Sequence, residues 1–230
     1  MKKTFLIGLA TLMLSCTSSL NAAHLTQDRE VAKFSGIDAR EGIKVNVVIG
    51  QAESVKVTAD DNYINDLITE VENGTLVIRW ARKMNFRSRS ATVDVVATDI
   101  NRIVASSGAS VKSKTLDVNT LATAASSGAR IEIDSLHASK LDAESSSGAL
   151  IVLSGEAERA ELDASSGARI KGSNLTAGNA KASASSGASV SVNVTDNLAA
   201  AASSGGSIRY GGKPQMSDIS ASSGGSISKL

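Results

Sequence analysis

The tripeptide Ser-Ser-Gly recurs seven times between residues 106 and 224 of this chain of 230 residues, at nearly constant spacing. The glycines are Gly108, Gly128, Gly148, Gly167, Gly187, Gly205 and Gly224, and successive glycines lie 18 to 20 residues apart. Recurrence at a fixed period is typical of proteins built from stacked structural repeats. The repeat therefore restricts this part of the chain to a repeat architecture.

Each repeat also has the alternation of a β-strand. A β-branched aliphatic residue stands three positions after every glycine, and a small residue stands three positions before it. The β-branched residues are Val111, Ile131, Ile151, Ile170, Val190, Ile208 and Ile227. A period of two places the odd offsets inward and the even offsets outward. A short strand cannot bury its inner face alone, so equivalent strands must stack, about 4.8 Å apart.

We therefore predict an all-β fold: a single-stranded parallel β-helix over residues 103–230, with about 19–20 residues per rung. Other repeat folds fit less well. A leucine-rich repeat needs more leucine and a returning helix, and a propeller blade needs about 40 residues. In a calcium-binding roll the acidic residues would share one offset, which the aspartates of this region do not.

The Ser-Ser-Gly motif is expected to form the corner of each rung. Glycine adopts backbone angles that cost other residues free energy, so it suits a sharp bend. The serine hydroxyl groups can bond to the turn itself or to the equivalent serines one rung away.

Residues 1–23 have the features of a secretory signal, with Lys2 and Lys3 before an apolar run from Phe5 to Leu14. Cys16, the only cysteine of the chain, follows this run where a bacterial lipoprotein is lipidated. Ordinary cleavage after Ala22 or Ala23 is the alternative. Both predict an exported protein of the cell envelope, on the periplasmic side or at the cell surface. A lone cysteine also excludes an internal disulfide.

Residues 24–102 lack the Ser-Ser-Gly repeat and are expected to form an irregular β segment that leads into the solenoid. Residues 43–50 and 53–60 alternate and are predicted to pair with each other. Ile64, Leu67 and Ile68 have the spacing of a short helix. Asn73-Gly74 between two alternating stretches predicts a hairpin.

The order of these features resembles a known family. The stretch from Phe34 to Trp80, with its NGTLVI hairpin, and the recurring SGA corners are similar to the "putative auto-transporter adhesin, head GIN domain" family. The resemblance covers about residues 31–230. It implies a right-handed β-helix begun by an irregular β segment, a cell-envelope protein of the kind frequent in Bacteroidetes, and a role in adhesion.

Catalysis needs titratable or nucleophilic groups held close together. His24 and His137 are the only histidines, and neither recurs beside the corner serines, so these serines are interpreted as structural. We predict no catalytic residue, no metal site and no cofactor. A β-helical enzyme acting on polysaccharide is the alternative, and it would require stacked acidic residues on one face.

The segment RWARKMNFRSR (79–89) is the first candidate binding site, because guanidinium and aromatic groups together suit sugars or phosphates. Trp80 is in phase with inward-facing Leu76 and is expected in the core. The candidate ligand-binding residues are Arg79, Arg82, Lys83, Phe86, Arg87 and Arg89.

A second set of cations occupies the outward offsets +2 and +4 from the corner glycines. These are Lys112, Arg130, Arg169, Lys171 and Arg209, with Glu132 as the single acid at these offsets. They form either a track for an anionic glycan or lipid headgroup, or a charged face that prevents association between sheets.

The sequence therefore predicts a non-catalytic adhesin or structural binding module. The expected partner is an envelope or host glycan, or another envelope protein. Loss of Lys2 and Lys3 changes the formal net charge from +1 to −1, which gives no general attraction to nucleic acid. Membrane contact is expected only through a lipid anchor. Self-association is a further alternative, since the last rung has no recognisable cap.

Overall fold

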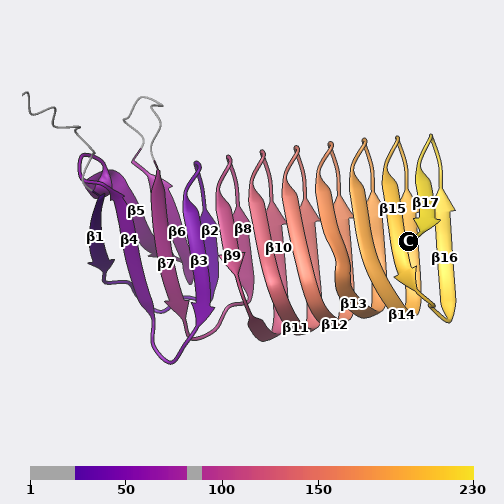
Figure 1. Cartoon of the computed structure of the whole chain (residues 1–230), viewed down its shortest axis with the longest axis horizontal. Helices are drawn as coiled ribbons and strands as arrows, with labels where there is room; N and C mark the ends of the chain where they lie inside the picture. Colours follow the sequence, from indigo (N-terminus) through magenta and orange to yellow (C-terminus); the bar gives the residue numbers. More distant parts are fainter. Residues whose placement is uncertain (1–23, 82–89) are drawn as a thin grey trace, which may run out of the picture.

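The computed structural model describes residues 24–81 and 90–230, and this part of the chain is an elongated stack of β-strands (Figure 1). The described residues contain seventeen strands and no α-helix, with one turn of 3-10 helix at Ile64–Asp66. None of the described helices has the length and apolar character needed to cross a membrane.

The solenoid consists of parallel strands from successive rungs, and the predicted parallel β-helix is confirmed. Its strands are β8 (Arg102–Ala105), β9 (Ser110–Ser113), β10 (Leu116–Ala125), β11 (Arg130–Ser145), β12 (Leu150–Ala164), β13 (Arg169–Ala184), β14 (Ser189–Ala202), β15 (Ser207–Gly212), β16 (Met216–Ala221) and β17 (Ser226–Lys229). Two sheets result from this stacking. Sheet 1 is formed by the strand segments that follow the corners, and sheet 2 is formed by the segments that lead into the corners.

The core is a column of β-branched side chains between the two sheets. Ile131, Ile151, Ile170, Val190 and Ile208 are paired in register from rung to rung. All five are buried, and small residues such as Ala125 and Ala164 face them from sheet 2. The predicted inward direction of the odd offsets is therefore confirmed.

The Ser-Ser-Gly corners align along one edge of the stack (Figure 1). The corner glycines have φ between 70° and 77°, as predicted, and the second serine also has a positive φ, between 48° and 52°. This turn directs the N–H of Gly128 to the carbonyl oxygen of Ser147 in the next rung, at 3.1 Å, and the same bond recurs along the edge. Among the described residues, backbone groups rather than serine hydroxyls connect the corners, which corrects the prediction of hydroxyl bonding.

The edge opposite the corners absorbs the variation in repeat length. Between β11 and β12 the register shifts, since Ile133 to Leu136 is matched by Leu153 to Gly155. Between β13 and β14 the segment from Gly172 to Thr176 is matched by Val192 and Asn193 alone. Repeats with extra residues therefore form a bulge at this edge, and shorter repeats make a tighter turn there. The corners and the core column stay aligned.

The strand stack continues beyond the Ser-Ser-Gly repeat. Strands β2 (Gly36–Ala39) and β3 (Lys44–Ile49) pair in parallel with β8 and β9, with Ala39 opposite Ala105 and Val45 opposite Val111. Glu41 and Gly42 have the same positive φ angles as a Ser-Gly corner, and Gly42 N–H bonds to Ser107 O at 3.0 Å. This pair is therefore a complete rung with a different corner sequence.

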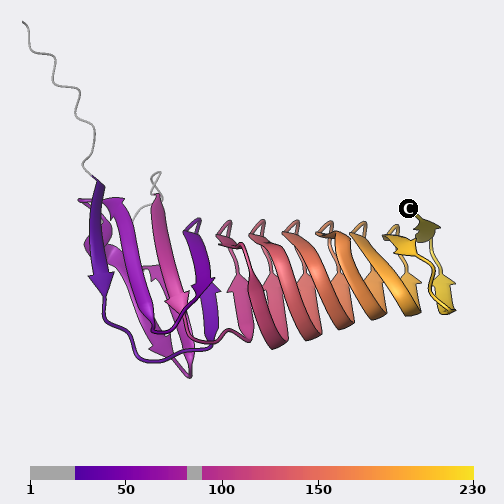
Figure 2. The same ribbon diagram turned by 60° about the horizontal axis from the view of Figure 1, so that its bottom comes forward.

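A further rung lies outside it, although it comes later in the chain. Strands β6 (Thr75–Trp80) and β7 (Ala91–Ala97) pair in parallel with β2 and β3 on the side away from β8 and β9. The early strands β2 and β3 are thus enclosed between two later rungs, as the colours in Figure 2 show.

Antiparallel strands cover this end of the stack. They are β1 (His24–Arg29), β4 (Ser54–Asp60) and β5 (Leu67–Glu72). The hairpin at Asn73-Gly74 is confirmed, because β5 and β6 pair antiparallel. The predicted pairing of 43–50 with 53–60 is wrong: β3 has β7 and β9 as neighbours, and β4 pairs with the far side of β7. The predicted helix is limited to a single 3-10 turn, since Leu67 already begins β5.

At the opposite end, β16 and β17 pair on one side only among the described strands. Ile219, at an inward position of this rung, is 44% exposed, and Met216 is 71% exposed. Self-association through this rung stays a prediction.

Ser145 is a local defect in the core. It is buried in register with Ala125 and Ala164, and its hydroxyl oxygen has no hydrogen-bond partner. We expect Ser145→Ala to raise the free energy of unfolding by about 1 kcal/mol, because it removes a buried unsatisfied polar group. Urea denaturation followed by circular dichroism measures this. Ser146→Ala in the adjacent corner, where the side chain is partly exposed, is the control and should change little; destabilisation by Ser145→Ala would contradict the explanation.

Candidate functional site

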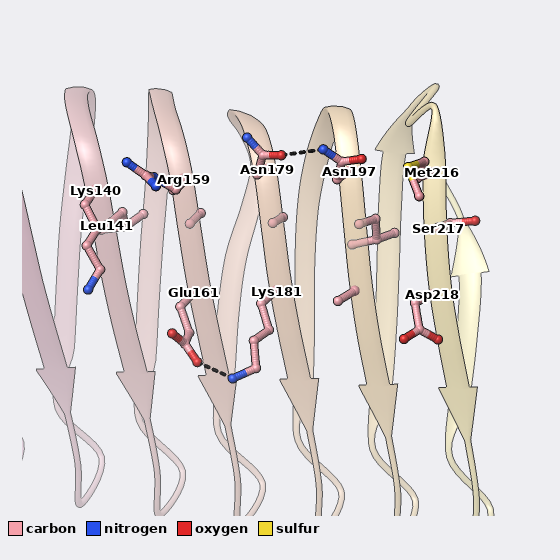
Figure 3. Close-up of a pocket in the computed structure, with 14 residues that line it drawn as sticks. Lys140, Leu141, Arg159, Glu161, Asn179, Lys181, Asn197, Met216, Ser217 and Asp218 are labelled. Atoms are coloured by element: carbon pink, nitrogen blue, oxygen red, sulfur yellow. Dashed lines mark hydrogen bonds and ion pairs between the residues drawn. The ribbon is translucent and has the colours of Figure 1, made fainter.

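A groove with polar walls and an apolar floor lies on sheet 2, with a volume of about 720 Å³ (Figure 3). Lys140, Arg159, Asn179 and Asn197 stand in register on four successive rungs and form one wall. Glu161, Lys181 and Asp218 form the other wall. The floor includes Leu141, Ala160, Ala180 and Leu198, which are themselves buried, and the short side chain of Ala199 stands between Lys181 and Asp218 on the second wall.

Two contacts fix the walls of the groove. Asn197 Nδ2 donates to Asn179 Oδ1 at 2.6 Å, and Lys181 Nζ donates to Glu161 Oε1 at 2.5 Å. The second contact lowers the pKa of Glu161 and raises the pKa of Lys181. A general acid needs a raised carboxyl pKa, so the Glu161 carboxylate is suited to binding and not to proton donation.

The groove crosses the strands and runs along the axis of the stack. Each rung contributes one polar side chain to the wall formed by Lys140, Arg159, Asn179 and Asn197, at intervals of about 4.8 Å. Lys140 and Arg159 form no ion pair with any residue in 24–81 or 90–230. The arrangement can donate several hydrogen bonds to one extended molecule.

Stacked acidic residues, which a β-helical enzyme would require, occur in the positions before the corner glycines. Asp142 lies opposite Glu161, and Glu144 lies opposite Asp163, all on the outer face of sheet 2. Counting back four and six residues from Gly148 and Gly167 would have found them. Within the described part of the chain, no group of three or more His, Cys, Asp or Glu residues could hold a metal ion.

The five cations predicted as one track on sheet 1 are divided by the structure into two groups. Glu132 accepts from Lys112 Nζ at 2.9 Å and from Arg130 Nη2 at 2.6 Å. Both contacts lower the pKa of Glu132, the Arg130 hydrogen bond most strongly. Arg169, Lys171 and Arg209 form no ion pair with any described residue.

Little of the predicted binding segment 79–89 is within the described residues. Trp80 is buried, as predicted, and its backbone N–H donates to Glu41 Oε2 at 2.9 Å. Arg79 lies on β6, partly buried, with its Nη2 3.8 Å from Glu70 Oε2. Arg82, Lys83, Phe86, Arg87 and Arg89 lie outside the described residues, as does Cys16.

The two histidines lie apart from each other in the structure. His24 begins β1, and His137 is exposed on β11 near the edge opposite the corners.

The family model described as "Putative auto-transporter adhesin, head GIN domain" matches residues 33–214. The chain belongs to this family. The predicted family resemblance is therefore confirmed, and the match runs from β2 to β15, leaving out β1 and the last rung. Within the head GIN domain family the irregular N-terminal strands and the solenoid are thus parts of one unit.

Solved structures from Bacteroidetes share this head GIN domain fold. A "putative adhesin" from Bacteroides fragilis is 22% identical, with a TM-score of 0.83 over 90% of this chain and 97% of the other. A "putative adhesin" from Parabacteroides merdae is 18% identical, with a TM-score of 0.72 over 91% and 97%. A "putative lipid binding protein" from Parabacteroides distasonis is 19% identical, with a TM-score of 0.68 over 91% and 98%. No curated protein matches the chain.

Proposed function

We propose that this head GIN domain protein is an exported cell-envelope protein that binds an envelope or host glycan without catalysing a reaction on it. The groove on sheet 2 carries the proposal, since it offers a row of donors over an apolar floor along several rungs. An extended sugar chain presents hydroxyl groups to such a row and its carbon faces to such a floor. Membership of an adhesin family supports a binding role.

Export is supported by the signal-like segment 1–23, and Cys16 is the proposed site of a lipid anchor. The lipid would then hold the N-terminal end of the protein at a membrane of the envelope, and the groove would be accessible to a glycan. Residues 79–89 stay a second proposed contact, because five cations lie within eleven residues there.

A glycan array probed with residues 24–230 tests the proposal. We expect binding to at least one envelope or host polysaccharide, and a loss of about tenfold in affinity when Arg159 and Asn179 are both replaced by serine, because each removes hydrogen bonds to the ligand. A variant with Arg79, Arg82, Lys83, Arg87 and Arg89 changed to serine tests the sequence-predicted segment in the same assay.

Arg102→Ser with Asn119→Ser is the matched control, because both side chains are exposed, lie outside the groove and have the same chemistry. Equal loss in the control and in the groove variant would exclude the groove as the site. Absence of glycan binding by the unaltered chain would overturn the glycan proposal. Turnover of a bound polysaccharide would instead favour the enzyme alternative.

A further inference from the structure

The outer face of sheet 1 has an uneven charge along the stack. Two columns of outward side chains run along this face, and strand register defines them. The first column is Asp94, Asn46, Lys112, Glu132, Val152, Lys171, Ser191, Arg209 and Ser228. The second column is Thr92, Lys44, Ser110, Arg130, Leu150, Arg169, Ser189, Ser207 and Ser226.

The half of this face nearest the antiparallel strands has acidic groups beside its cations. Its columns contain Lys44, Lys112 and Arg130 together with Asp94 and Glu132, and Asp134 lies beside the columns. Glu132 bonds to both Lys112 and Arg130, and Asp134 lies 3.4 Å from Lys112 Nζ. Direct ion pairs occupy Lys112 and Arg130, so these two cations are poorly available to a ligand.

The other half of the face is cationic without compensation. Beyond Leu150 and Val152 the two columns contain Arg169, Lys171 and Arg209, and every remaining member is serine. None of these three cations has an ion-pair partner among the residues the structure describes. A charge of +3 is therefore exposed over three rungs, next to hydroxyl groups that donate and accept hydrogen bonds.

A hollow of about 570 Å³ lies within this cationic half. Lys171, Arg209 and the hydroxyl-bearing Ser173, Ser191 and Ser207 line it together with apolar residues, among them Val152 and Leu230. Lys171 and Arg209 are both in register with Ser191, so their Cα atoms are two rungs, or about 10 Å, apart. Because Ser191 has a short side chain, the space between the long side chains of Lys171 and Arg209 stays open.

The bulge between Gly172 and Thr176 borders the hollow with Ser173 and Asn174. Contacts fix its geometry: Ser173 Oγ and Ser191 Oγ are 3.0 Å apart, and Asn193 Nδ2 donates to Ser173 O at 2.5 Å. The hydroxyl groups are therefore held at defined positions beside the two cations.

We propose that this cationic half of sheet 1 is a second binding site, separate from the groove on sheet 2, for an acidic polysaccharide strand that carries sulfate or carboxylate groups. The polysaccharide chain lies along the axis of the stack. One of its acidic groups binds Lys171 and another binds Arg209, while hydroxyl groups of the sugar contact Ser191 and Ser207. Arg169 adds attraction from the neighbouring column. An extended polyanion matches cations that repeat along one axis better than a single small anion does.

Isothermal titration of residues 24–230 with heparin, as a sulfated probe, and with polygalacturonate, as a carboxylate probe, tests this site. Neutral dextran and free sulfate are measured beside them. We expect binding to at least one polyanion and not to dextran. Replacing Arg169, Lys171 and Arg209 by serine should reduce the affinity about tenfold or more, since charged hydrogen bonds are lost.

Lys44→Ser with Lys112→Ser and Arg130→Ser is the matched control. It removes the same charge from the same face, but from the compensated half, and it should change the affinity less than about threefold because salt screens charges two rungs away. Glu132→Gln removes the carboxylate between Lys112 and Arg130, and for the same reason it should also change the affinity less than about threefold. Far-UV circular dichroism verifies that each variant is folded.

Equal loss in the control and in the triple variant would overturn the site, as would unchanged affinity in the triple variant. Free sulfate binding as tightly as the polymer would overturn the extended-strand geometry. The groove variant Arg159→Ser with Asn179→Ser should retain polyanion binding, so failure of this site and failure of the proposed groove give different results.

Discussion

Replacing Ile151 by alanine is expected to lower the free energy of unfolding by about 2–5 kcal/mol. Ile151 is fully buried and is paired in register with Ile131 on one side and Ile170 on the other. Ala125 and Ala164 are among the buried small residues of sheet 2, and such short side chains cannot extend into the space left. The cavity therefore adds to the lost burial of the side chain.

The measurement is urea denaturation of the folded chain, followed by circular dichroism. Val152→Ala is the control. Val152 lies on the same strand and rung as Ile151, but its side chain points outward and is only partly buried. We expect Val152→Ala to cost less than about 1 kcal/mol. Similar costs for the two changes would show that the β-branched column is not the main source of stability in the solenoid.

Gly155→Ala is the second change with a large expected effect. Gly155 has φ 117°, which side-chain-bearing residues rarely adopt, and a Cβ there would overlap the backbone of Leu136 in the preceding rung. At the edge opposite the corners, β12 passes from sheet 1 to sheet 2 with one residue fewer than β11, and Gly155 lies in this shorter segment. We expect a loss of more than about 3 kcal/mol, because strain and a clash with the backbone add.

Gly148→Ala separates these two causes. This corner glycine has φ 72°, and an added Cβ would meet no atom within 4 Å. Only the conformational cost remains, roughly 1–2 kcal/mol. Thermal unfolding of both variants should therefore rank Gly155→Ala as clearly more damaging. The opposite order would mean that the corners, and not the opposite edge, are the sterically restricted part of each rung.

Several features of the solenoid were predictable because they repeat. The position three residues after each glycine faces inward in every rung, so a single pattern is supported by seven examples. Trp80 was also placed correctly, since it continues the alternation of Leu76 and Ile78 into the core. In each case a local period of two decides the direction of the side chain.

The N-terminal rungs were not predictable in the same way. The corner at Glu41-Gly42 shares with Ser-Ser-Gly only its glycine, and the pairing partner of β3 is β7, more than forty residues later. A local alternation predicts that a stretch is a strand but does not identify its neighbour, which depends on contacts distant in sequence. The expected pairing of 43–50 with 53–60 failed for this reason.

The candidate sites depend even more on such contacts. The sequence identified five outward cations on sheet 1, but only the register shows that Glu132 stands between Lys112 and Val152 and reaches Arg130 as well. Likewise, Lys140, Arg159, Asn179 and Asn197 have different chemistry and no common motif. They become one wall because successive rungs place them side by side.

The sequence by itself determined the repeat, the corner and the inward column, since these follow from local backbone geometry and from the alternation of strands. Only the tertiary structure decided which early strands join the stack, which cations are neutralised and where the surface is hollow. The physical reason is that stacking brings together residues about twenty positions apart in the solenoid and much further apart at its N-terminal end. Their charge, size and register then combine in ways that no single repeat contains.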